Sequence, residues 1–171
     1  EQLGTMALAG DAGVELRLGQ EPTELPPGID GVVLSPGVPP DRPLLVAARA
    51  AGVPVIAEVE FAFPYLNGTI AAITGSNGKS TTTALTGALL ASAGQSAVVC
   101  GNFGTPVSAC VAGPPGRAFV LELSSFQLEG TRSLNASAAT VLNITPDHMD
   151  CYRSLADYSA AKQRIFHGDG V

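Results

Sequence analysis

The chain has 171 residues, of which 46% are hydrophobic and 14% are charged. Its net charge is −6, with 9 basic against 15 acidic residues, and this argues against sequence-independent nucleic-acid binding, which needs basic side chains to replace counterions. No apolar run approaches the roughly eighteen residues of a membrane-spanning helix and no basic-then-apolar leader is present, so no membrane insertion is expected.

Residues 1–66 are predicted to be part of a first, Rossmann-like α/β domain. Pro43 opens a helical pattern and Gly52 follows it, the positions that proline and glycine prefer at the two ends of a helix. Strands and helices alternate: strands at residues 14–18 and 31–35, a helix over 43–51, a strand at 53–57 and a helical stretch over 58–66. The turn signal Asn67-Gly68 places the domain boundary, which leaves residues 67–171 as part of a second domain.

The turn Ser35-Pro36-Gly37 comes directly after the second predicted strand. Ligands of open parallel sheets collect beyond the carboxyl ends of strands, so Gly37 could let the backbone approach a substrate phosphate or sugar. An ordinary proline-glycine turn is the alternative, and spacing alone favours it.

Residues 70–83 read as a buried strand, a glycine turn and the start of a helix. Gly75 and Gly78 permit a turn whose backbone N–H groups point at an anion, and a helix N-terminus favours negative charge. Lys79 can reach outer phosphates, and Ser80 or Thr81 offers a hydroxyl to Mg²⁺. The strict P-loop pattern would need glycine in place of isoleucine at position 73, and a chance Gly-Lys-Ser turn is the alternative.

The rest of the second domain continues the alternation of strands and helices. The expected elements are a helix over 80–93, strands at 97–100, 118–123 and 138–144, and an amphipathic helix over 154–166. Right-handed crossovers then give a parallel sheet, and the ends of four strands meet along one edge. The fold class is α/β, with a parallel-sheet, P-loop-type central domain.

Polar residues follow several of these strands. Glu122 closes an apolar strand, where a bound cation would compensate its burial, and with Ser80 or Thr81 it suits Mg²⁺. A solvated glutamate is the alternative. His148 lies in a loop after another strand and could reach a second metal or a substrate, or simply bond to its own loop. Lys162, between alanines on a helix, reads as a surface residue by spacing alone.

The three cysteines, Cys100, Cys110 and Cys151, have no metal-ligand spacing and are odd in number, so neither a zinc site nor a disulfide framework is predicted. Small buried hydrophobes in a reducing, cytoplasmic compartment are the simplest interpretation. Because the chain begins at Glu1 and ends at Val171 without a terminal element, we expect it to be part of a longer protein.

Several separated motifs occur in the order found in Mur ligases, a family that the chain resembles from about residue 30 onwards. These are Thr74-Gly75-Ser76-Asn77-Gly78-Lys79-Ser80-Thr81, Gly101-Asn102, Leu121-Glu122-Leu123-Ser124-Ser125-Phe126-Gln127-Leu128-Glu129, Asn143-Ile144-Thr145-Pro146-Asp147-His148-Met149-Asp150 and Ala161-Lys162. The Glu-Leu-Ser-Ser-Phe-Gln-Leu-Glu string resembles the members that attach D-glutamate to UDP-N-acetylmuramoyl-L-alanine.

The resemblance implies an ATP- and Mg²⁺-dependent amide ligase of peptidoglycan precursor synthesis, acting through an acyl phosphate and expected to be a monomer. It implies the following roles: Gly75, Ser76, Asn77, Gly78, Lys79, Ser80 and Thr81 bind ATP; Ser80, Thr81 and Glu122 hold a first Mg²⁺; His148 and a carbamylated Lys162 serve a second; Asn102 and Ser124 contact the muramoyl substrate; and Gly37 contacts its uridine diphosphate. Lys79, Glu122, His148 and Lys162 would be the catalytic set.

One departure is Cys151, where many relatives have arginine before Tyr152. The alternatives are a different Mur-family ligase, adding alanine or a diamino acid, a folylpolyglutamate synthase, or a non-catalytic nucleotide-binding module. A P-loop GTPase or kinase lacks support, because no switch aspartate or kinase catalytic loop is recognisable.

Overall fold

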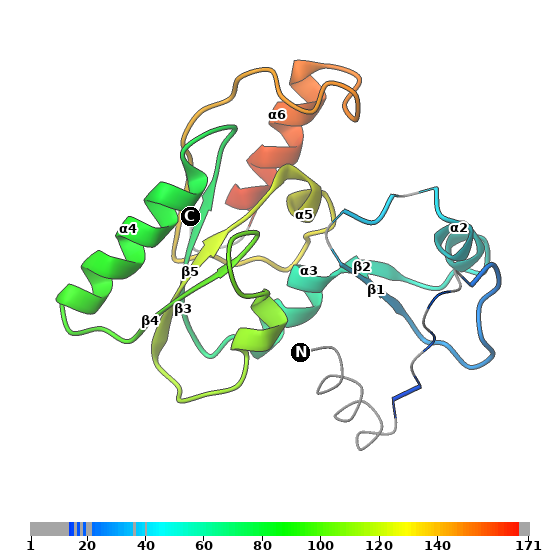
Figure 1. Cartoon of the computed structure of the whole chain (residues 1–171), viewed down its shortest axis with the longest axis horizontal. Helices are drawn as coiled ribbons and strands as arrows, with labels where there is room; N and C mark the ends of the chain where they lie inside the picture. The colour runs from blue at the N-terminus through cyan, green and yellow to red at the C-terminus, as the bar shows by residue number, and fades with distance from the viewer. Residues whose placement is uncertain are drawn as a thin grey trace.

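The structure, a computed structural model, describes residues 14, 15, 17, 19, 22–35, 37–39 and 41–167 (Figure 1). Its strands form two parallel sheets, one of two strands in the order β1-β2 and one of four in the order β4-β5-β3-β6. The predicted parallel α/β class is confirmed. Within these residues, no helix has both the length and the apolar character needed to cross a membrane.

The smaller sheet pairs β1 (Val32–Leu34) with β2 (Val55–Ala57), and α2 (Pro43–Ala50) connects them. Pro43 occupies the first turn of α2, and Gly52 takes the left-handed φ of +70° just beyond its end, as the sequence predicts. Of the predicted strand at 14–18, residues 14, 15 and 17 are described and none of them lies in a strand, while residues 16 and 18 lie outside the described residues.

The segment between the two sheets consists of α3 (Glu58–Ala62) and the 3₁₀ turn η1 (Phe63–Tyr65). Its residues Val59, Ala62 and Phe63 are buried in the core of the larger sheet. The Glu58 carboxylate accepts a hydrogen bond from the Ser108 N–H (2.6 Å), and Glu60 accepts one from the Arg132 N–H (2.7 Å). Packing therefore joins this segment to the larger unit, while the division of the chain at residue 66 stays a prediction.

In the larger sheet, β3 (Gly68–Thr74) lies between β5 (Arg117–Glu122) and β6 (Ala138–Val141), and β4 (Ala97–Gly101) lies outside β5. The helical segments around it are α4 (Lys79–Ser92), η2 (Val107–Cys110), α5 (Ser125–Glu129), α6 (Leu155–Gln163) and η3 (Arg164–Phe166). Figure 1 shows α4 on one side of the sheet and α5 and α6 on the other. The connection through α4 runs from β3 to β4 and the connection through α5 runs from β5 to β6, which is the opposite direction across the sheet. Right-handed crossovers in opposite directions place their helices on opposite faces.

Two local predictions need correction. The expected strand over 138–144 ends at Val141. Beyond it, the Leu142 N–H donates to the Thr74 oxygen at the end of β3, and the Asn143 oxygen accepts from the Ser76 N–H in the loop that follows β3. The short helix α5 was not predicted. Its signal is in the sequence, since Ser124 and Gln127 form a capping box in which the Ser124 Oγ accepts from the Gln127 N–H.

The cysteines divide into two groups. Cys100 and Cys110 are buried in the core and free, which agrees with their interpretation as small hydrophobes, and burial raises the pKa of the Cys100 thiol. Cys151 is free but exposed, so that interpretation is wrong for this residue.

Gly87 sets how closely α4 approaches the sheet. A Cβ atom at this position would lie 2.4 Å from Cγ2 of Val99 on β4. We expect Gly87→Ala to destabilise the protein by about 1–3 kcal/mol despite the better helix propensity of alanine, because the helix must move off the strand. Urea unfolding measures this change. Adding Val99→Ala should relieve the clash, so a double-mutant cycle with additive effects would contradict this explanation.

Candidate functional site: a phosphate loop at the carboxyl edge of the sheet

The turn that joins β3 to α4 is built around two glycines. Gly75 has φ +154° and Gly78 has φ +82°, so neither position suits a side chain. The Lys79 ammonium folds back over this turn and donates to the carbonyl oxygens of Gly75 (2.9 Å) and Ser76 (3.0 Å). The first turn of α4, which contains Ser80 and Thr81, presents N–H groups that have no intrahelical partner. Such a turn suits an anion.

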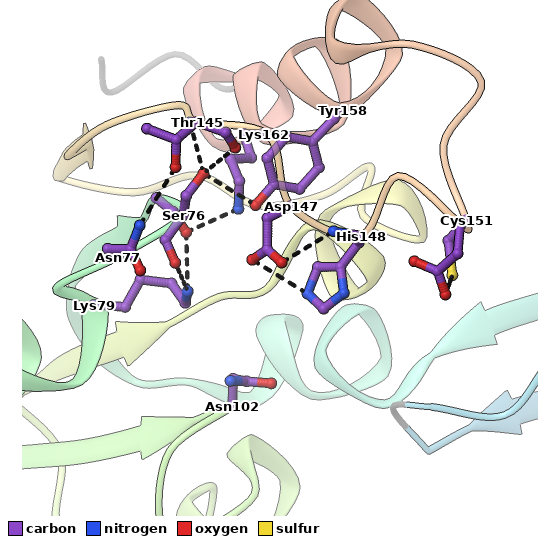
Figure 2. Close-up of polar contacts among 12 residues, drawn as sticks. Ser76, Asn77, Lys79, Asn102, Thr145, Asp147, His148, Cys151, Tyr158 and Lys162 are labelled. Carbon is purple, nitrogen blue, oxygen red and sulfur yellow. Dashed lines mark hydrogen bonds and ion pairs between the residues drawn. The ribbon is translucent and has the colours of Figure 1, made fainter.

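A second ammonium, that of Lys162 on α6, reaches the same turn. Its Nζ donates to the Gly75 oxygen (3.0 Å), the same oxygen that Lys79 bonds, and lies 4.5 Å from the centre of the Tyr158 ring (Figure 2). The Lys162 side chain is only 1% exposed, so its interpretation as a surface lysine is wrong. Burial and then the Lys79 charge lower the pKa of Lys162 to about 8, while Asp147 opposes this shift. A substantial neutral fraction follows near pH 8.

Glu122, the last residue of β5, is 2% exposed. It pairs in register with Ile73 of β3 and Gly101 of β4, which puts it at the carboxyl edge beside the phosphate loop. One carboxylate oxygen accepts a hydrogen bond from Asn102 Nδ2 (2.9 Å), and the other, Oε2, is buried with no partner among the described residues. A buried carboxylate oxygen without a donor is costly unless a cation compensates it.

The donors at this edge fit Mg²⁺. Glu122, Ser80 and Thr81 offer only oxygens, the atoms that this ion prefers. Within the described part of the chain, no group of three or more His, Cys, Asp or Glu side chains could hold a metal. Protein ligands would therefore supply part of the coordination, and phosphate oxygens and water the rest, as is usual for Mg²⁺ beside a nucleotide.

His148 lies in the loop after β6 and has a left-handed φ of +54°, an uncommon conformation for a residue other than glycine. Its ring centre is 5.2 Å from that of Phe126 and 6.4 Å from that of Tyr158. Nε2 lies 3.7 Å from Asp147 Oδ2, and the side chain is half-exposed. The His148 side chain is therefore open to solvent and lies next to Tyr158, the residue that also contacts Lys162 (Figure 2).

The three predicted substrate contacts have different settings. Asn102 is committed to Glu122, and Ser124 caps α5 through Gln127. Gly37 has φ +85° and lines a hollow of the smaller sheet with Val32, Leu34, Pro39, Arg42 and Leu44. One edge of the larger sheet thus brings together Lys79, Lys162 and the Asn102–Glu122 pair. Gly37 instead lies after β1 of the smaller sheet. Their roles stay predictions.

Sequence reasoning gave no separate role to several residues that organise the site. The Ser76 hydroxyl donates to the Thr145 carbonyl oxygen (3.0 Å) and accepts from the Thr145 N–H (3.0 Å). It also lies 3.3 Å from the Tyr158 hydroxyl. Asn143 bonds the peptide group of Asn77. The motif that carries Asn143 and Thr145 is visible in the sequence, but nothing in it says that this loop pairs with the glycine turn.

Comparison with known proteins identifies the family of the chain. The model of the Mur ligase middle domain matches residues 73–170. UDP-N-acetylmuramoylalanine–D-glutamate ligase of Anaeromyxobacter dehalogenans is 53% identical over 166 residues, which cover 96% of this chain and 36% of the relative. The enzyme of the same name from Myxococcus xanthus is 54% identical over 147 residues, covering 82% and 32%. The chain thus spans about a third of the length of the curated relatives it matches.

Solved structures show the same fold. UDP-N-acetylmuramate-alanine ligase MurC from Thermotoga maritima matches with a TM-score of 0.53 and 24% identity, covering 93% of this chain and 38% of that chain. A ligase titled UDP-N-acetylmuramate:L-alanyl-gamma-D-glutamyl-meso-diaminopimelate ligase, from Neisseria, matches with a TM-score of 0.55 and 18% identity, covering 80% and 48%.

A parallel sheet whose central strand runs through a glycine turn into a lysine-bearing helix defines a nucleotide-binding α/β unit of the P-loop type. The family match extends over more than half of the chain. The chain belongs to the Mur ligase family, whose members depend on ATP.

Proposed function

We propose that the protein carrying this chain is an ATP-dependent ligase that joins D-glutamate to UDP-N-acetylmuramoyl-L-alanine in peptidoglycan precursor synthesis. The observation that carries the proposal is the convergence of two ammonium groups, those of Lys79 and Lys162, on the Gly75 oxygen. A binding module needs one such lysine for phosphate. The names of the relatives, which are 42–54% identical to this chain, favour D-glutamate as the amino acid.

In the proposed reaction, a carboxylate oxygen of the UDP substrate attacks the γ-phosphorus of ATP, and the bond to ADP breaks. The D-glutamate amine then attacks the acyl phosphate carbon, and inorganic phosphate leaves through a tetrahedral intermediate with loss of the amine proton. Lys79, Gly78, Ser80 and Thr81 hold the phosphates in line, and Gly75, Ser76 and Asn77 form the part of the loop that presents these groups. Mg²⁺, when bound by Ser80, Thr81 and Glu122, would neutralise charge on the transferring group.

Lys162 has a second proposed role. Its neutral amine adds to CO₂ and loses a proton, which turns an ammonium into a carbamate anion able to serve a second metal together with His148. The lowered pKa of Lys162 supports this role because only the neutral amine is nucleophilic. Asn102 and Ser124 are proposed to contact the muramoyl part of the substrate, and Gly37 its uridine diphosphate. We further propose that the protein is a cytoplasmic monomer.

Phosphate release by the full-length protein tests the proposal. Release from ATP is expected only when Mg²⁺, UDP-N-acetylmuramoyl-L-alanine and D-glutamate are all present, with one amide bond formed per phosphate. L-Alanine, a diamino acid and L-glutamate are each offered in place of D-glutamate as control substrates. Turnover with one of these, or with a folate as acceptor, would assign a different ligase, and tight ATP binding without amide formation would assign a nucleotide-binding module.

A further inference from the structure

The loop after β6 is joined to the phosphate loop by a pattern of bonds centred on one side chain. Asn143 Oδ1 accepts from the Asn77 N–H (2.9 Å), and Asn143 Nδ2 donates to the Asn77 carbonyl oxygen (3.0 Å). The backbone oxygen of Asn143 accepts from the Ser76 N–H (3.0 Å). One asparagine therefore holds two consecutive residues of the phosphate loop.

The pairing is specific to an amide side chain. A carboxamide carries an N–H donor and an oxygen acceptor in one plane, so it can bond at the same time to the carbonyl oxygen and the N–H of one residue. Aspartate would lose the bond to the Asn77 oxygen, and serine is too short to reach both peptide atoms. Asn143 and Asn77 are both exposed, so the pair is not needed to fill the core, and its main effect is to hold the loop in one conformation.

The pairing also decides which groups are left for phosphate. The N–H groups of Ser76 and Asn77 both point at Asn143 and are committed. The next N–H groups along the chain, from Gly78 into the first turn of α4, have no such partner among the described residues. An anion is thereby directed to the end of the loop that carries Lys79.

The same bonds continue towards His148. Gly75 lies against Leu142, since a Cβ at Gly75 would be 3.1 Å from that side chain, and Thr145 bonds to Ser76 on both its N–H and its oxygen. Asn143 sits between these contacts. The two loops therefore form one unit that extends from the phosphate site to the segment bearing His148.

We propose that Asn143 is a positioning residue that holds the phosphate loop ready for ATP and fixes it to the His148 segment. This rests on the proposed function only in taking the anion to be ATP. Without the Asn143 side-chain amide, the peptide group of Asn77 would become ordered only when the nucleotide binds. The free energy of this ordering would weaken the binding of ATP.

The test compares ATP binding by the full-length protein and by Asn143→Ala, using titration calorimetry with Mg²⁺ present. Loss of two hydrogen bonds of ordinary strength is expected to raise the dissociation constant for ATP about tenfold. The KM for the UDP substrate should stay within about twofold, and hydrogen exchange of residues 75–78 in the nucleotide-free protein should become faster while that of β3 is unchanged. Asn135→Ala, an exposed asparagine in the loop before β6, is the matched control and should alter none of these.

ATP affinity within twofold of the parent, or an equal loss in Asn135→Ala, would overturn the proposal. If Asn143→Ala fails to fold, Asn143→Ser takes its place with the same expected result. The ratio of the ATP dissociation constants of variant and parent tests the role of Asn143. The amine that the full-length protein accepts tests the proposed function. Either proposal can therefore fail while the other stands.

Discussion

Replacing Lys162 by methionine is expected to abolish amide formation, by about a thousandfold or more, without lowering the thermal midpoint of unfolding. Methionine fills the same buried space but has no amine, so neither a carbamate nor a charge can form. The Gly75 oxygen would keep its bond from Lys79, and a buried ammonium would be removed from its costly environment. Ligase assays and thermal unfolding of the full-length protein measure the two effects.

The controls for Lys162 separate chemistry from structure. Lys162→Ala should be equally inactive, and excess bicarbonate should not restore it, because the group that takes up CO₂ is gone. Lys162→Arg retains the positive charge and should also be inactive. A methionine variant that keeps turnover would show that the lysine is not needed for the reaction. One that loses stability together with activity would show that its role is structural.

The pH dependence gives an independent readout of Lys162. Its pKa is about 8 in the folded protein against 10.5 ordinarily, so between these values the unfolded chain holds a proton that the folded chain lacks. The free energy of unfolding from this group therefore rises with pH across that window, when CO₂ is absent. This contribution should vanish in Lys162→Met. At a fixed, limiting concentration of dissolved CO₂, activity of the parent should increase as the pH rises through about 8, because the neutral amine increases.

Replacing Glu122 by glutamine should cause the second large loss, about a thousandfold in kcat/KM, or about 4 kcal/mol of transition-state stabilisation. Glutamine keeps the shape of the side chain and an oxygen for the Asn102 bond but carries no charge. The unpartnered Oε2 is the atom that a cation would use. The concentration of Mg²⁺ needed for half-maximal activity should rise at least tenfold, while thermal stability should not fall.

A matched control for Glu122 lies on α5. Glu129→Gln removes a carboxylate near Tyr152 and Arg164, outside the proposed metal set, and should change kcat/KM by less than about twofold. If Glu122→Gln retained the Mg²⁺ dependence of the parent, the assignment of the carboxylate to the metal would be wrong. An equal loss in Glu129→Gln would indicate a general effect of charge.

The two variants both replace a buried charged side chain at the site. Lys162 and Glu122 are both almost fully buried, although charged side chains seldom are unless they are paired. Folding leaves one with a lowered pKa and the other with an unpartnered oxygen, and neither arrangement is favourable for the isolated chain. The proposed function would account for both, because the neutral Lys162 amine would take up CO₂ and Glu122 Oε2 would bind a cation.

Much of the fold follows from local sequence pattern. The apolar runs that became β3 and β5, the proline and glycine at the ends of α2, and the glycines of the phosphate loop each specify a structure through neighbouring residues. The net charge of −6 argues against sequence-independent nucleic-acid binding, and this stays a prediction. The family was also recognisable, because several motifs occur in one order, and the family match confirmed it.

The site could be assembled from sequence only in part. The alternation of strands and helices implies that strand ends meet, which brings Glu122 near Lys79, but it does not say that the unpartnered oxygen of Glu122 is buried. Lys162 shows the limit most clearly, since between alanines on a helix it looks like any surface lysine. Asn143 shows it again, because its partner is 66 residues away.

By itself, the sequence determined most of the elements, their parallel arrangement and the family, because these depend on periodicity, turn residues and motifs that lie close together in the chain. Only the tertiary structure decided that Lys162 is buried against Tyr158, that Glu122 keeps one oxygen free, and that Asn143 holds the phosphate loop. The physical reason is that burial, pKa and hydrogen-bond partnership are properties of the surroundings of a side chain, and those surroundings come from segments far apart in the sequence.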